Sequence, residues 1–226
     1  MRSAWWWGTE QWATYQAAYY SDRPQVAEWK SSPLANDHDL GDVPDGYEIV
    51  TRQTQVIDLS YPLPTLWQGV RKSYHSIIHR ANEQWEVEAE QTHPSMLLYQ
   101  SLHAKANGRQ PRVDATYECQ EKWLRGGHGL LVSAHDWDNC AMWAACSYWI
   151  VYKGCAYYAS GPAIERNVQH AVIWKSLELL KARGIQFVEM GQIDGETEKE
   201  INIGKFKAGF GGRPVPFQIV RKVQGR

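Results

Sequence analysis

The segment from Cys155 to Gly212 constrains the fold of this chain more than any other. It begins with a short, aromatic, β-prone run, Cys155 to Ser160, that ends at a Gly-Pro turn. Apolar residues then recur at helical spacing from Val168 to Leu180, and an alternating run from Ile185 to Met190 predicts a second strand. A short helix that carries Lys207 follows. The order strand, helix, strand predicts a crossover connection and therefore a parallel pair of strands.

The other periodic segments predict one mixed sheet flanked by helices, an α/β fold in which the two parallel strands splay apart. The expected strands are Tyr47 to Leu59, Trp85 to Gln91, Gly129 to Asp136, Cys140 to Tyr152 and Val215 to Val223, and the expected helices are Pro64 to Asn82, His93 to Ala106 and Asp114 to Trp123. Residues 47–226 are expected to form a single domain. Residues 1–46 are expected to form an N-terminal extension with a short helix from Glu10 to Tyr20.

Composition limits the class of protein. A chain of 226 residues with 43% apolar and 22% charged residues is typical of one soluble domain. We find no signal peptide and no apolar run near the roughly 20 residues that cross a bilayer, so we expect a cytoplasmic protein. The four cysteines form no CxxC pair, and His75 and His79 have no evident third ligand. The sequence therefore predicts no metal and no cofactor.

Two blocks of sequence resemble the Fem family of aminoacyltransferases, the FemX-like proteins, which have a fold of the GNAT type (an N-acyltransferase fold). The first block contains YYASG, a long helix with His170 and Trp174, RGIQFVEMGQI and IGKFKAGFGG. The second is VIDLSYPLPTLWQGVRKSYHSIIHRANEQWEVE, from Val56 to Glu88. Together they span about residues 50 to 226 in the family's order. Fem proteins usually hold two such domains, and this chain has room for one.

The resemblance implies an aminoacyltransferase that moves an aminoacyl group from aminoacyl-tRNA to an amine and forms a peptide bond. The lysine of the family's FK pair matches Lys207, which is then the catalytic residue that stabilises the oxyanion. Candidate substrate-binding residues around it are Phe206, Tyr158, Ser160, Asn167, His170 and Asp194. Tyr157 is an alternative to Tyr158, since only one of the two neighbours can face the site. The basic C-terminal segment offers candidate tRNA-binding residues, namely Lys205, Arg213, Arg221 and Lys222.

The first turn of the helix at Val168 bears on the donor. GNAT enzymes that use coenzyme A bind its pyrophosphate there, on a loop whose central glycine lets the backbone approach the phosphates. Gln169 occupies that position here, which favours aminoacyl-tRNA as the donor. The acceptor is then a peptidoglycan precursor or a small peptide-like metabolite, and the single domain favours the smaller one. Two alternatives remain open: an acyl-CoA-dependent N-acyltransferase and a noncatalytic binding module with this fold.

Overall fold

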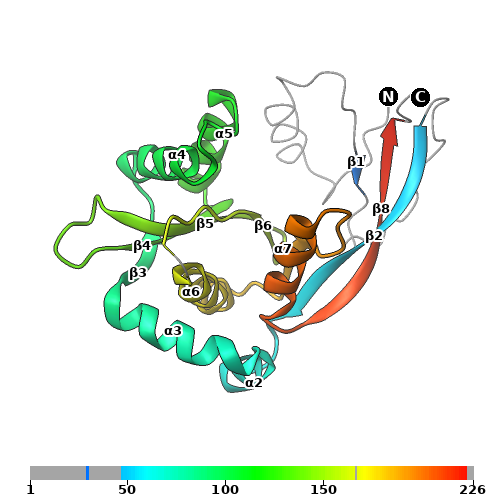
Figure 1. The fold of residues 1–226 in the computed structure, drawn as a ribbon, viewed down its shortest axis with the longest axis horizontal. Helices are drawn as coiled ribbons and strands as arrows, with labels where there is room; N and C mark the ends of the chain where they lie inside the picture. Colours follow the sequence, from blue (N-terminus) through cyan, green and yellow to red (C-terminus); the bar gives the residue numbers. More distant parts are fainter. Residues whose placement is uncertain (1–28, 31–46, 166, 223–226) are drawn as a thin grey trace.

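The computed structural model describes residues 29–30, 47–165 and 167–222 (Figure 1). In these ranges one sheet of eight strands has the order β1-β8-β2-β7-β6-β5-β4-β3. The strands are β1 (Trp29–Lys30), β2 (Tyr47–Asp58), β3 (Glu86–Glu90), β4 (Gly129–His135), β5 (Trp143–Tyr152), β6 (Cys155–Ser160), β7 (Phe187–Gln192) and β8 (Arg213–Lys222). The pair β6–β7 is parallel, and the other neighbouring strands run antiparallel. The predicted mixed sheet, with a crossover helix between β6 and β7, is therefore confirmed.

Helices cover both faces of the sheet, as Figure 1 shows. They are α2 (Leu63–Gly69), α3 (Lys72–Gln84), α4 (His93–Asn107), α5 (Asp114–Arg125), α6 (Val168–Ala182) and α7 (Glu198–Ala208). The crossover helix α6 lies on one face beside α3, while α4 and α5 lie on the other. Alternation along β5 decides which core each side chain enters: Trp149 points to the α6 side and Tyr148 to the α4–α5 side.

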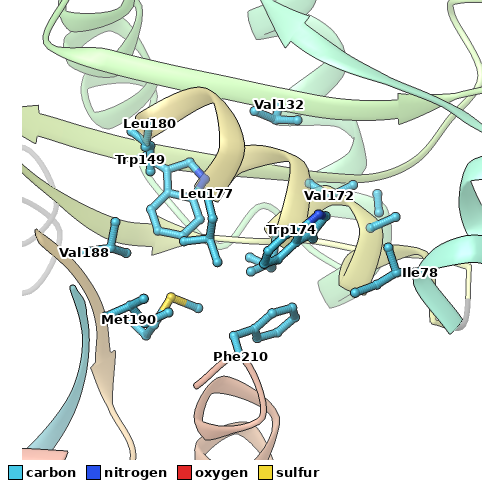
Figure 2. Close-up of a cluster of buried hydrophobic side chains, with 14 of the residues drawn as sticks. Ile78, Val132, Trp149, Val172, Trp174, Leu177, Leu180, Val188, Met190 and Phe210 are labelled. Atoms are coloured by element: carbon cyan, nitrogen blue, oxygen red, sulfur yellow. The ribbon is translucent and has the colours of Figure 1, made fainter. Parts of the chain in front are cut away.

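The core on the α6 side is the larger of the two. Figure 2 shows Trp149, Leu177 and Val188 packed together, with Phe210 closing the cluster from the segment after α7. All four side chains are almost fully buried. Burying an aliphatic or aromatic side chain of this size contributes about 1.5–3 kcal/mol. This core therefore holds α6, β7 and the end of α7 together.

Several expected elements have different boundaries; for example, the strand expected from Ile185 to Met190 runs from Phe187 to Gln192. The single helix expected from Pro64 to Asn82 is wrong, because the chain forms α2 and α3 with extended backbone at Val70 and Arg71 between them. That break lets the Arg71 N–H donate to the Gly209 carbonyl at 2.8 Å, which ties the start of α3 to the end of α7. The strand expected from Cys140 starts at Trp143, since the preceding residues form a turn in which the Met142 N–H donates to the Asn139 carbonyl. The last strand starts at Arg213 rather than Val215.

The helix expected from Glu10 to Tyr20 lies outside the described residues. The pair Trp29–Lys30 extends the sheet beyond β8, opposite Val220 and Ile219. A domain boundary at residue 46 stays a prediction. Among the helices described here, none combines the length and apolar character that crossing a bilayer requires.

Candidate active site

The parallel strands β6 and β7 part in the middle of the sheet. They pair through Cys155–Phe187, Ala156–Val188 and Tyr157–Glu189, and the ladder ends there although both strands continue. The predicted splay is confirmed. Beyond the last pair, the carbonyl of Ala159 on β6 accepts a hydrogen bond from the Arg112 guanidinium at 3.0 Å instead of one from β7. Ligands of open α/β sheets bind where neighbouring strands separate in this way.

Helix α7 brings Lys207 to this point. Its first turn is fixed by a capping box between Thr197 and Glu200. One face then packs on the loop after β7: a Cβ on Gly204 would lie 1.9 Å from the Ile193 carbonyl oxygen, so only glycine permits the contact. Three residues further on, the Nζ of Lys207 donates to the Gln192 carbonyl at 3.0 Å.

A glycine leaves the space that the lysine occupies. Gly191 has a φ of +77°, in the region that disfavours side chains. A Cβ at Gly191 would lie 3.2 Å from the Nζ of Lys207 and 3.3 Å from the hydroxyl of Tyr157. The ammonium and the phenol therefore converge on the same small volume at the parting of the strands.

A buried carboxylate lies beside them. Glu189 is 2% exposed, and its Oε1 accepts a hydrogen bond from the Thr54 hydroxyl at 3.0 Å. Because Glu189 pairs directly with Tyr157 in the parallel ladder, their side chains leave the sheet on the same face. The sequence reasoning did not select Glu189. Its signal was a glutamate within an apolar strand, two residues before Gly191.

The structure brings Tyr157, rather than the candidate Tyr158, to Lys207. Tyr158 points to the α6 side, where its ring lies 5.0 Å from Trp149 and its hydroxyl accepts a hydrogen bond from Gln169 at 3.2 Å. Burial raises the pKa of Tyr158 above its usual range, so the phenol stays protonated. The hydroxyl of Ser160, another candidate, is hydrogen-bonded to that of Tyr99.

His170 and Phe206 belong to an aromatic cluster between α3, α6 and α7. The ring of His170 lies 4.3 Å from Tyr74 and 5.0 Å from Phe206. Its Nδ1 donates to the Asn167 carbonyl at 2.9 Å, since a carbonyl can only accept. Burial, followed by the Arg71 charge, lowers the pKa of His170, which keeps the imidazole neutral near pH 7. Asn167 itself is exposed, at the N-terminus of α6 with a φ of +71°.

The remaining candidates are dispersed. Asp194 accepts a hydrogen bond from the backbone N–H of Gln53 at 2.9 Å, which fixes the loop between β7 and α7 to β2. Lys205 is exposed on α7, and Arg213 is exposed at the start of β8. Arg221 and Lys222 lie at the far end of β8, about 30 Å away along the strand, and their side chains are outside the described part. These four residues do not form one compact patch.

Two sets of possible metal ligands lie in the described ranges: the pair His75 and His79 noted in the sequence, and a cluster near the sheet edge. The Nε2 of His75 is hydrogen-bonded to the Trp67 carbonyl. Near the sheet edge, Glu88, Glu90 and His135 place one ligand atom each within 4.8 Å of one another. Hydrogen bonds within the protein already engage each of these three side chains. The metal-free prediction is not tested by this arrangement.

Comparison with solved structures defines the class of fold: this chain has the GNAT-type fold of FemX-like proteins. The structure of FemX matches with a TM-score of 0.59 and 11% sequence identity over 82% of this chain and 63% of FemX. The structure of L-PGS from Bacillus licheniformis matches with a TM-score of 0.56 and 10% identity, over 80% of this chain and 63% of that protein. A GCN5-related glucosamine N-acetyltransferase region of a fungal β-N-acetylglucosaminidase gives 0.50 and 11%, over 86% of this chain and 25% of that one.

These similarities concern the fold. This chain spans less than two thirds of FemX and of L-PGS. The sequence matches no known family profile and no curated protein.

Proposed function

We propose that this chain transfers an acyl group to an amine, and that the donor is an aminoacyl-tRNA. The observation that carries the proposal is the Lys207 ammonium at the parting of β6 and β7. In this reaction the amine nitrogen attacks the ester carbonyl, whose oxygen becomes negatively charged in the tetrahedral intermediate. An ammonium held beside that oxygen stabilises the charge. The ester C–O bond then breaks, and an amide bond remains.

Proton transfer requires a second group. The attacking amine must lose a proton, and the departing ribose oxygen must gain one. Glu189 is the carboxylate on the same face as Tyr157, and we assign it the proton-accepting role, with the Tyr157 hydroxyl orienting the amine. Replacing Glu189 by glutamine should keep the hydrogen bond from Thr54 but lower the turnover number, with loss of the acidic limb of the pH–rate profile, because a carboxylate accepts a proton only while it is deprotonated.

The contacts at the start of α6 support a donor other than coenzyme A. The amide of Gln169 and the hydroxyl of Tyr158 both approach Gly161 so closely that a Cβ there would lie 2.5 Å and 1.7 Å from them. These two side chains fill the space between the end of β6 and the first turn of α6. That is the space which a pyrophosphate needs in order to reach the helix N-terminus.

The acceptor that we propose is a small peptide-like amine, with a peptidoglycan precursor as the larger alternative. The reaction would take place in the cytoplasm, where aminoacyl-tRNA is available. Because Arg213 lies at the opposite end of β8 from Arg221 and Lys222, the basic residues suit an elongated polyanion such as tRNA rather than a single phosphate group.

The test is transfer of radiolabelled amino acid from a mixed pool of charged tRNA to a pool of amines and peptidoglycan precursors. We expect an amide product that disappears after ribonuclease treatment. Parallel calorimetry with acetyl-CoA should show no heat of binding. Acetyl-CoA binding with acyl transfer would instead establish the coenzyme A-dependent alternative. Binding of charged tRNA without any product would establish a noncatalytic module.

A further inference from the structure

The C-terminal end of α7 lies against the first turn of α3. The last carbonyls of a helix have no partner in the regular helical pattern, so each must find a donor elsewhere. The Lys207 carbonyl accepts from the N–H of Phe210, in a tight turn that closes the helix. The Lys205 carbonyl, two residues before Lys207, accepts from a side chain of α3. The end of the helix that carries Lys207 is therefore completed by a different helix.

Arg71 supplies that side chain. Its Nη2 donates to the Lys205 carbonyl at 3.1 Å, and its backbone N–H donates to the Gly209 carbonyl at 2.8 Å. These two bonds reach α7 on either side of Lys207. Within the described ranges Arg71 forms no ion pair with an acidic side chain. Its charge lies instead at the C-terminus of α7, where the helix dipole favours a cation.

Tyr74, one turn further along α3, adds a second contact. Its hydroxyl donates to the Phe206 carbonyl at 3.3 Å and accepts from the Nη1 of Arg71 at 3.4 Å. The ring of Tyr74 lies so close to Gly209 that a Cβ there would come within 2.3 Å of it. The φ of Gly209 is −67°, which any residue can adopt, so glycine is needed here for space. Arg71 and Tyr74 together fix the backbone before and after Lys207.

The other polar and backbone anchors of α7 lie before the lysine. The capping box of Thr197 fixes the first turn, and Gly204 packs on the loop after β7. Helix ends fray where nothing holds them. Loosening of the last turn would move the stem of Lys207 and take its Nζ away from the Gln192 carbonyl.

We propose that Arg71 is a positioning residue for the candidate active site: its guanidinium, with the Tyr74 hydroxyl, holds the last turn of α7 so that the Lys207 ammonium stays at the parting of β6 and β7. The proposal rests on the function proposed above for Lys207. A misplacement of about 1 Å can cost on the order of 10²-fold in rate. Loss of the guanidinium should therefore lower kcat and leave binding of the donor unchanged.

Three variants of the full chain test this role. Arg71→Met removes the guanidinium but keeps the backbone N–H that bonds to Gly209. Tyr74→Phe removes one hydroxyl and keeps the ring. Lys72→Met is the matched control, because it removes an exposed charge from the next residue of the same turn. Melting curves confirm that the variants fold, and Tyr74→Phe carries the test should Arg71→Met fail to fold.

The position of Lys207 can be measured without any activity. Each protein is treated with a trace of acetic anhydride, and mass spectrometry gives the acetylation of Lys207 relative to Lys199, an exposed lysine in the first turn of α7. We expect this ratio to rise severalfold in Arg71→Met and Tyr74→Phe, because the Lys207 ammonium is no longer held in place, and to stay constant in Lys72→Met. An unchanged ratio in Arg71→Met would overturn the proposal.

Kinetics of acyl transfer then connect position to chemistry. Arg71→Met should lower kcat by about ten- to hundredfold with an unchanged KM for the donor. In a chain that already carries Lys207→Met, the same replacement should have little further effect, because the guanidinium acts through the lysine. A structural role alone would lower kcat by the same factor in both chains, and that result would refute the proposal. If the unaltered chain transfers no acyl group, the proposed function fails, and the labelling ratio still decides whether Arg71 holds Lys207.

Discussion

Replacing Lys207 by methionine is the sharpest test of the proposed chemistry. Methionine keeps the length and apolar stem of the side chain but removes the ammonium. A single oxyanion donor is typically worth about 10²–10³ in rate, or about 2.7–4 kcal/mol of transition-state stabilisation. We therefore expect kcat to fall by about that factor. Binding of the donor should change little, because the developing oxyanion exists only after attack.

The structure also sets the expected cost in stability. The ammonium of Lys207 donates to the Gln192 carbonyl, and loss of that hydrogen bond costs about 0.5–1.5 kcal/mol. Domains of this size have a free energy of unfolding of about 5–15 kcal/mol. The variant should therefore remain folded, with a melting temperature lower by only a few degrees. A loss of activity that tracks unfolding would contradict a catalytic role.

Two further variants complete the comparison. Lys207→Arg keeps the charge, but the larger planar guanidinium must fit between Gly191 and the Tyr157 hydroxyl, so we expect poor activity. Lys199→Met removes an exposed lysine from the first turn of the same helix and should leave kcat unchanged. The assay is steady-state transfer from the charged tRNA that the pool experiment identifies. Wild-type kcat in Lys207→Met would show that the fold carries no lysine-assisted chemistry.

Three other expectations concern stability and geometry. Gly191→Ala should lower the free energy of unfolding by about 1–3 kcal/mol because of the positive φ, and its methyl group should also displace Lys207 and abolish activity. The control is Gly184→Ala, at a φ of +78° with open space around it. It should lose similar stability but keep full activity in the same assay. Gly204→Ala should lower both the melting temperature and kcat, because its methyl group would enter the backbone of the loop after β7; a normal melting curve would refute the close packing. Burial lowers the pKa of His103 to about 3. Below about pH 6.5 the unfolded chain therefore binds a proton that the folded chain excludes. The free energy of unfolding should fall in this range by up to about 1.4 kcal/mol per pH unit. Urea titrations from pH 7 to 4 should show a shallower loss in His103→Gln than in the unaltered chain, and an equally steep loss would contradict the role of His103.

Local patterns predicted the crossover unit correctly, since its strands and helix lie close together in sequence. They did not reveal that β2 lies between β7 and β8, because such pairing joins residues at least 129 positions apart, as Asp58 and Phe187 are. The break at Val70 was missed for a related reason: the hydrogen bond from Arg71 to Gly209 that stabilises it is a tertiary contact. Helical periodicity continues across the break and gives no sign of it.

The choice between Tyr157 and Tyr158 is a feature of the candidate site that could not be predicted from the sequence. Neighbouring residues of a strand face opposite sides, so one of the two had to face the site and the other the core. The sequence contains no signal for which face α6 covers. In the structure α6 packs against the face of Tyr158, which leaves the Tyr157 face to Lys207.

The candidate site depends on β2 although β2 supplies none of its three converging groups. Thr54 on β2 holds the carboxylate of Glu189, and Gln53 fixes the loop after β7 through both its N–H and its carbonyl. That loop is the surface on which Gly204 packs, and the packing of Gly204 sets the height of Lys207 over Gly191. The chemistry of the segment from β6 to α7 is therefore positioned by a strand that precedes it by about a hundred residues, which explains why the motif with Lys207 needs the whole sheet around it.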